Sequence, residues 1–204
     1  VTEVIESLEN HSKKYQKNPS SYYYQVRESE PTSHIEKVSK LIFLNKTCFN
    51  GLYRVNSKGK FNVPLGSYTN PNIVNKENLL VVSQILQSSN LEFFCRDFEQ
   101  SLHDIKRDDF VYFDPPYQPV SQTANFTSYT NRSFTADDLE RLANLAEKLD
   151  SMGCKVLLSN SKSKIVENSF SSSKWKIKEI RVNRAINSNS AKRTGHSEVL
   201  IKNY

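Results

Sequence analysis

The stretch Phe110-Val111-Tyr112-Phe113-Asp114-Pro115-Pro116-Tyr117 decides the fold, because an apolar run of strand length ends abruptly in a charged residue and two prolines. Proline lacks the backbone N–H that would continue a strand, so this strand is expected to end at Phe113. Further along, Lys155-Val156-Leu157-Leu158-Ser159-Asn160 predicts a second buried strand. Continuous rather than alternating apolar runs are typical of parallel strands.

Between these two strands the sequence predicts one well-marked helix. Thr135 is a natural N-cap with Asp138 three residues on, and Gly153 is expected to end the helix. Phe134 and Leu139 have the spacing of a hydrophobic staple. One face is apolar and comprises Leu139, Leu142, Ala143, Ala146 and Leu149. The order strand–helix–strand predicts an α/β fold with a doubly wound, parallel sheet and an antiparallel edge.

Apolar spacing and turn residues predict the remaining elements. Helices are expected around Ile5–His11 and Ile35–Leu44, with a break at Pro19, and again over Asn78–Gln87 and Ile165–Phe170. Strands are expected at Leu91–Cys95, Trp175–Val182 and Glu198–Ile201. Arg54-Val55 and Lys60–Val63 flank a turn in which Gly59 takes positive φ, which predicts a hairpin.

The charge balance favours a polyanionic partner. The 204 residues include 28 Lys and Arg against 22 Asp and Glu, a net charge of +6. The basic residues gather, with Tyr, Phe and Asn among them, in Lys13–Lys17, Arg54–Lys60, Lys174–Arg184 and Lys192–Arg193. Nucleic acid is the preferred partner, ahead of an acidic membrane surface. A basic hairpin is the expected form of a DNA-reading element, although a solvated connecting loop has the same composition.

Several protein classes are disfavoured by composition. No apolar run approaches the roughly 18–20 residues that span a bilayer. The three cysteines, Cys48, Cys95 and Cys154, form no CxxC motif, so we expect small buried side chains in a reducing compartment rather than disulfides or structural zinc. No metal site is expected.

The tetrapeptide after the first strand has the parts of a pocket for an aromatic amine. In such sheets ligands bind at the carboxyl ends of the strands. The Asp114 carboxylate and the Pro115 carbonyl form a paired acceptor that matches the two hydrogens of an exocyclic amino group. Tyr117 adds a flat face on which a planar ring can stack. The alternative is a strand-ending turn whose Asp is satisfied locally.

These motifs resemble a known family. Asp114-Pro115-Pro116-Tyr117 resembles the catalytic motif of N6-adenine DNA methyltransferases. The stretch from Leu44 to Asn56, with Gly59, Phe61–Pro64, Gly66 and Tyr68, resembles the D12 or Dam-like class, which includes enzymes that modify GATC. The resemblance continues through Thr123–Tyr129, Ser133–Thr135, Leu158–Ser161 and Arg184–Tyr204, and covers most of the chain from residue 35.

The resemblance implies a class I S-adenosylmethionine-dependent methyltransferase fold, a Rossmann-like fold, and a cytoplasmic protein encoded by a prokaryote or a phage. The target adenine would be flipped out of the duplex and stacked on Tyr117, with its N6 bonded to Asp114 and to the Pro115 carbonyl in the rigid turn completed by Pro116. The cofactor would be S-adenosylmethionine, held in part by Asp97 and Phe98 and bordered by Asp114. Neither a metal nor a covalent enzyme intermediate is implied.

The resemblance also implies a set of DNA contacts. Phe49 and Asn50 match positions that fill the vacated stack, and Arg54 would read guanine through a bidentate contact. The full set is Phe49, Asn50, Leu52, Arg54, Lys58, Lys60, Pro64, Tyr68 and Asn125. The expected division of function is residues 1–75 for target recognition and residues 76–204 for the C-terminal part of the catalytic domain.

One family feature is not found. None of the 5 glycines, at positions 51, 59, 66, 153 and 195, forms the Gly-rich turn that holds the methionine part of the cofactor. We therefore expect an N-terminal segment or a partner chain to supply it, and an exposed apolar sheet edge. The alternative is a catalytically incomplete DNA-binding fragment. Methylation of a protein glutamine is disfavoured, because related glutamine enzymes carry Asn where this chain has Asp114; an RNA base is disfavoured as well.

Overall fold

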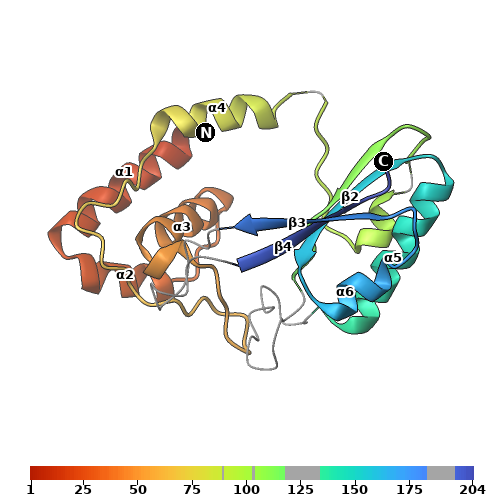
Figure 1. Cartoon of the computed structure of the whole chain (residues 1–204). Helices are drawn as coiled ribbons and strands as arrows, with labels where there is room; N and C mark the ends of the chain where they lie inside the picture. Colours follow the sequence, from red (N-terminus) through yellow and green to blue (C-terminus); the bar gives the residue numbers. More distant parts are fainter. Residues whose placement is uncertain (89, 103, 118–133, 183–195) are drawn as a thin grey trace. The chain divides into compact units, whose positions relative to one another are not determined.

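The structure, a computed structural model, describes residues 1–88, 90–102, 104–117, 134–182 and 196–204. Contacts divide the chain into two compact units, of which the first spans Val1–Phe93 and the second contains the described residues from Phe94 onward. The first unit is helical and the second is built around a β-sheet (Figure 1). These units reflect packing alone, so the division of function at residue 75 stays a prediction.

The first unit begins with three helices, α1 (Thr2–Lys17), α2 (Pro19–Glu28) and α3 (His34–Thr47). The two helices expected here are confirmed, but α2 was not foreseen. Its cap explains why the break is so short: the Asn18 side chain accepts a hydrogen bond from the Ser21 N–H at 3.3 Å. Pro19 takes the first helical position, where a missing N–H costs nothing.

The core of the first unit is largely aromatic. Leu8 on α1, Tyr23 on α2 and Phe43 on α3 are each fully buried. The Tyr23 hydroxyl donates to the Val63 carbonyl at 2.9 Å, which fastens the following loop to the helices. The Arg27 guanidinium donates to the same carbonyl at 3.4 Å, so two side chains of α2 hold the segment that carries the hairpin.

The hairpin over residues 54–63 is confirmed. Val55 and Phe61 form an antiparallel bridge, and the Asn62 N–H donates to the Arg54 carbonyl at 3.0 Å. Gly59 has a φ of +72°, a conformation that costs a residue without Cβ nothing. Before the hairpin comes a short 3-10 turn, η1 (Phe49–Gly51).

The segment after the hairpin is only partly as expected. Helix α4 (Lys76–Leu86) confirms the predicted helix, although none of its residues is buried. The strand predicted at Leu91–Cys95 is wrong: this segment has no strand structure, and Phe93 is 71% exposed. A strand forms only where a neighbour pairs with its backbone groups, and within the described residues no strand pairs with this segment.

The sheet of the second unit contains β1 (Phe110–Phe113), β2 (Lys155–Ser161), β3 (Lys176–Val182) and β4 (His196–Lys202). Their order is β1-β2-β4-β3. Strands β1 and β2 are parallel, as predicted, whereas β4 is antiparallel to both β2 and β3. The predicted antiparallel edge is therefore wrong in position, because the antiparallel strand lies inside the sheet. Burial explains this: β4 buries Val199 and Ile201, while β3 is mostly exposed and takes the edge.

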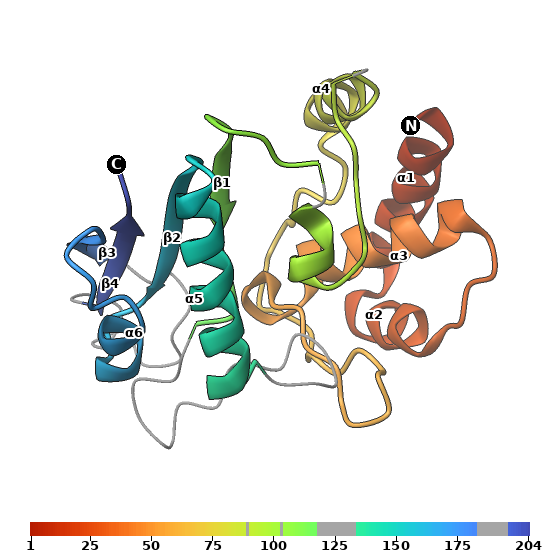
Figure 2. The same cartoon turned by 90° about the vertical axis from the view of Figure 1, so that its right-hand side faces the viewer.

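Helices α5 (Ala136–Ser151) and α6 (Lys164–Ser169) lie against one face of the sheet (Figure 2). All five apolar residues predicted for the inner face of α5 are buried, and Val111, Val156 and Leu158 pack in the same core. At the end of α5, Gly153 adopts a φ of +83°, and the Cys154 N–H donates to the Leu149 carbonyl at 3.0 Å. This is the glycine stop that was expected. Trp175 is buried just before β3.

Two further sequence expectations concern exposure. Within the described part of the chain, no helix has both the length and the apolar character needed to cross a membrane. Cys48 and Cys154 are buried free thiols, as expected, but Cys95 is exposed. Its position in the segment 91–95, which is not a strand, explains the difference.

Replacing Thr135 with alanine is expected to lower the free energy of unfolding of the second unit by about 1 kcal/mol. Thr135 and Asp138 form a reciprocal capping box, in which the Asp138 N–H donates to the Thr135 hydroxyl at 3.3 Å and the Thr135 N–H donates to Asp138 at 2.9 Å. Urea denaturation followed by circular dichroism measures the effect. The control is Thr69→Ala, since Thr69 lies in a bend of the first unit. Equal losses in the two variants would contradict the capping role.

Candidate functional site

The Asp-Pro-Pro-Tyr motif directly follows β1, at the end where β1 and β2 both finish. Asp114 is exposed there, while Pro115, Pro116 and Tyr117 are partly buried. The parallel register sets Phe113 beside Leu158, so the next residues, Asp114 and Ser159, are brought together. The Ser159 hydroxyl donates to Oδ1 of Asp114 at 2.8 Å. Ser159 therefore occupies one oxygen of the Asp114 carboxylate, Oδ1. The other oxygen, Oδ2, can accept a hydrogen bond from another donor.

Tyr117 is anchored by a strand from much later in the chain. Its hydroxyl donates to Oε2 of Glu198 at 3.3 Å. Because β4 is antiparallel, its first residues meet the last residues of β2, and Glu198 is registered opposite Ser161. Partial burial raises the pKa of Tyr117, and the nearby carboxylates of Glu198 and Asp114 act in the same direction. The phenol therefore keeps its proton as a donor at neutral pH.

This arrangement can bind a planar aromatic amine. A carboxylate oxygen and the backbone carbonyls of a proline turn accept hydrogen bonds, and a tyrosine ring fixed through its hydroxyl provides a stacking surface. Among the described residues no three His, Cys, Asp or Glu side chains are grouped to hold a metal ion. The groups that the motif brings together are thus suited to orient and polarise a ligand.

Asp97 and Phe98, predicted to contact a cofactor, belong to a charged cluster in the second unit. Arg141 donates to Asp97 at 2.9 Å and to Glu99 at 2.5 Å, and its guanidinium lies 4.8 Å from the centre of the Phe98 ring. The Glu99 N–H bond and the Arg141 bond lower the pKa of Asp97, so this carboxylate is ionised at neutral pH. Arg141, a residue of α5, therefore holds the side chains of both Asp97 and Phe98.

The basic residues of the hairpin have different partners. Arg54 is exposed and donates from Nε to the Asn62 side chain at 2.8 Å and from Nη2 to the Asn62 carbonyl at 3.4 Å. Lys60 pairs with Glu30 at 2.8 Å, while Lys58 is exposed beside the turn. The guanidinium of Arg54 is consequently oriented across the hairpin, which suits a residue that reads a base edge.

The other predicted DNA contacts fall on two joined segments. The Phe49 N–H donates to the Pro64 carbonyl at 2.8 Å, and Asn50 has a φ of 53° in the turn. Phe49, Pro64 and Tyr68 are exposed, whereas Leu52 is half-buried against the helical core. The Tyr68 ring packs on Gly66, where any Cβ would clash with it. Asn125 lies outside the described residues, as do Lys192 and Arg193.

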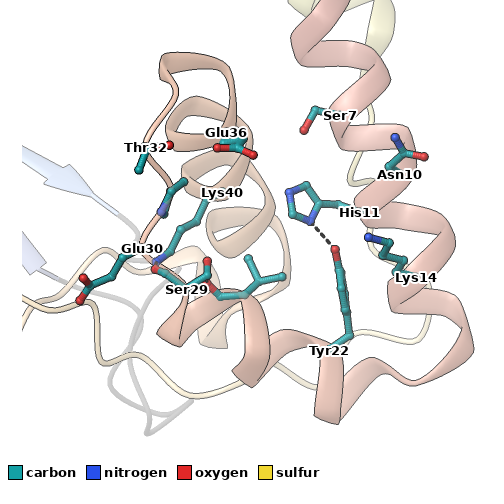
Figure 3. Close-up of a pocket in the computed structure, with 12 residues that line it drawn as sticks. Ser7, Asn10, His11, Lys14, Tyr22, Ser29, Glu30, Thr32, Glu36 and Lys40 are labelled. Carbon is teal, nitrogen blue, oxygen red and sulfur yellow. Dashed lines mark hydrogen bonds between the residues drawn. The ribbon is translucent and has the colours of Figure 1, made fainter.

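A pocket of about 450 Å³ lies within the first unit and was not foreseen. Nδ1 of His11 and the Tyr22 hydroxyl meet in it at 2.8 Å (Figure 3). The imidazole also stacks on Phe43, with ring centres 4.9 Å apart. Burial, with a smaller contribution from Lys14, lowers the pKa of His11, so its ring is neutral at pH 7. The charged side chains that line the pocket, of both signs, are Lys14, Lys40, Glu30 and Glu36.

The sequence gives Glu198 only as the start of a predicted strand and does not single out Arg141. Ser159-Asn160, at the end of the second predicted strand, is expected from the sequence either to border the adenine pocket or to cap the next helix. The structure favours the first of these, because Ser159 contacts Asp114 and Ser163 caps α6 instead. Alternation along β1 and the register of the parallel pair would have indicated Ser159. No local signal points to Glu198, since its position depends on pairing between distant strands.

Comparisons with known proteins give a consistent result. The family model for D12 class N6 adenine-specific DNA methyltransferases matches residues 1–186. The chain is 38% identical over 208 residues to the type II methyltransferase M1.LlaDCHI of Lactococcus lactis subsp. cremoris, with 99% of this chain and 72% of the relative covered. It is 44% identical over 194 residues to the type II methyltransferase M.MjaIII of Methanocaldococcus jannaschii, with 90% and 64% covered.

A third relative is the DNA adenine methylase of Escherichia coli K12, which is 34% identical over 185 residues, with 90% of this chain and 65% of the relative covered. The chain thus spans about two thirds of the length of these relatives. The similarity begins earlier than residue 35, since the family match includes all of the first three helices.

Proposed function

Because the chain belongs to the D12 class of N6 adenine-specific DNA methyltransferases, we propose that it transfers a methyl group from S-adenosylmethionine to N6 of an adenine flipped out of duplex DNA. The proposed target is GATC or a related site, and the proposed setting is the cytoplasm. We further propose that the sheet belongs to a class I, Rossmann-like methyltransferase fold. The parallel pair β1–β2, joined by α5, supports this assignment.

The contact between Ser159 and Asp114 at 2.8 Å carries the proposal. This contact shows that the motif carboxylate lies at the end of two parallel strands, which is where ligands bind in such sheets. Tyr117, held by Glu198, is the surface on which a flipped adenine would stack. The motif therefore provides an acceptor for an exocyclic amine, Asp114, and a stacking surface for the planar base that carries it, Tyr117.

The chemistry follows from what these acceptors do to the amine. Hydrogen bonds from N6 to Asp114 and to the Pro115 carbonyl would draw the nitrogen lone pair out of conjugation with the ring. N6 then forms a bond to the methyl carbon, the carbon–sulfur bond breaks, and N6 loses one proton to solvent. S-adenosylmethionine supplies the electrophilic methyl group when bound. The protein contributes position and charge.

The cofactor fits the described residues in part. Asp97 is ionised and Phe98 presents a ring beside it, which suits an adenine end with amino or hydroxyl donors. Arg141 holds both side chains in place. None of the 5 glycines of the chain forms a Gly-rich turn for the methionine end, and that observation favours the second candidate, a DNA-binding module without catalysis.

One experiment separates the two candidates. The chain is incubated with methyl-labelled S-adenosylmethionine and a duplex containing GATC, and the nucleosides are then separated. Label on N6-methyl-2′-deoxyadenosine is expected, and a duplex already methylated at N6 serves as the control. Binding of the duplex without transfer, together with no affinity for S-adenosylmethionine in a titration, would refute the enzyme and leave the DNA-binding module.

A further inference from the structure

Two hydroxyl groups on neighbouring strands form a chain that ends at the motif aspartate. The Tyr112 hydroxyl donates to the Ser159 hydroxyl at 3.0 Å, and Ser159 donates to Oδ1 of Asp114 at 2.8 Å. Tyr112 and Asp114 are two residues apart on β1 and its extension, so alternation puts them on the same face of the sheet. Ser159 reaches that face from β2.

The direction of this chain is set by chemistry. A carboxylate accepts hydrogen bonds, so the Ser159 hydroxyl donates its one hydrogen to Asp114. Its oxygen is then available as an acceptor, and Tyr112 supplies the proton. Each group therefore has a defined role, and the two bonds reinforce each other.

Burial makes the inner bond the stronger constraint. Ser159 is only 4% exposed, whereas Tyr112 is 51% exposed. Water competes poorly for a buried hydroxyl, and a hydrogen bond to a charged acceptor is about twice as strong as a neutral one.

We propose that Ser159 and, behind it, Tyr112 are positioning residues, which hold one oxygen of the Asp114 carboxylate so that the other faces the amino group to be methylated. The role assigned to the amino group rests on the proposed function. The hydroxyl chain itself does not, because it exists in the protein alone. Neither residue touches the reacting atoms.

The Ser159 hydroxyl is not needed to form the sheet. The sheet pairing of Ser159 is made through its backbone, beside Leu200. Alanine fills nearly the same volume, so Ser159→Ala removes the hydrogen bond and little else. Tyr112→Phe removes only the outer bond, from a half-exposed ring. Ser159→Thr restores the hydroxyl.

The first measurement uses the carboxyl ¹³C resonance of Asp114 in the chain without DNA or cofactor. We expect Ser159→Ala to shift it, Tyr112→Phe to shift it less, and Ser159→Thr to return it toward the wild-type position. The matched control is Ser151→Ala, since the exposed Ser151 hydroxyl donates only to a helix carbonyl, that of Glu147. An Asp114 resonance that is the same in Ser159→Ala and in the control would overturn the proposal.

The second measurement is the steady-state methylation of duplex DNA. We expect kcat to fall about tenfold in Ser159→Ala and less in Tyr112→Phe, with KM for the duplex unchanged, because a hydrogen bond to a charged group is lost only at the reacting end. A rise in KM without a fall in kcat would also overturn the proposal. Failure of the wild-type chain to methylate would refute the proposed function instead, and the carboxyl resonance would still decide the positioning role.

Discussion

Asp114→Ala is expected to reduce methyl transfer by about two to three orders of magnitude while leaving the Kd for duplex DNA within about twofold of the wild-type value. A preorganised charged acceptor that acts on the reacting group typically contributes this much to kcat. Asp114 is an exposed carboxylate bonded to Ser159, and its negative charge is unsuited to a phosphate contact, so its loss is expected to remove a transition-state contact and not a DNA contact.

The measurement pairs single-turnover methylation with a fluorescence binding assay on the same duplex. Asp137→Ala is the control, because Asp137 is an exposed aspartate in the first turn of α5, outside the motif. Asp114→Asn keeps one carbonyl oxygen and loses the charge, and it is expected to fall between the alanine variant and the wild type. Equal losses of binding and of turnover in Asp114→Ala would contradict the assigned role.

Arg54→Ala is expected to reduce discrimination at one base pair by about ten- to a hundredfold, which corresponds to about 1–3 kcal/mol for a bidentate guanine contact. The Asn62 side chain accepts from the Nε edge of Arg54, which orients the guanidinium, while Nη1 and Nη2 retain hydrogens for guanine O6 and N7. The slope of binding against salt is expected to stay almost unchanged, because no phosphate contact is lost.

Lys58→Ala provides the opposite expectation. Lys58 is exposed beside the turn, so its loss is expected to weaken all sequences alike and to flatten the salt dependence by about one unit. Lys60 is less suited to this comparison, since it pairs with Glu30. Binding to a set of single-mismatch duplexes at two salt concentrations distinguishes the two variants. If Arg54→Ala weakened every duplex by the same factor, Arg54 would be a phosphate contact and the GATC proposal would lose its main support within this chain.

The features that the sequence predicts well depend on neighbours along the chain. Local hydrogen bonds determine the capping box of Thr135 and the glycine stop at Gly153. The end of β1 follows from Pro115, because proline has no backbone N–H to donate. The same holds for the hairpin with Gly59 in its turn, and for the motif itself.

The features that it missed depend on residues far apart in the sequence. The place of β4 inside the sheet, and with it the contact between Glu198 and Tyr117, is decided by which strand buries more apolar surface. The strand predicted at Leu91–Cys95 failed because apolar composition says nothing about whether a partner is present. Asp97 and Phe98 were named from a resemblance, and their joint partner Arg141 came only from the structure.

The insertion of β4 between β2 and β3 has a consequence for how the protein is synthesised. The ribosome releases β2 and β3 before β4, yet these two strands have no mutual pairing and meet only through the later one. During translation β3 therefore leaves the ribosome before β4, the strand that pairs with it among the described residues, and Glu198 reaches Tyr117 only after β4 has been released. Long-range closure of this kind is slow and leaves strand edges open to aggregation. The proposed binding surface for the base is thus complete only after β4 has been made, and a chain interrupted before β4 lacks the Glu198 partner of Tyr117.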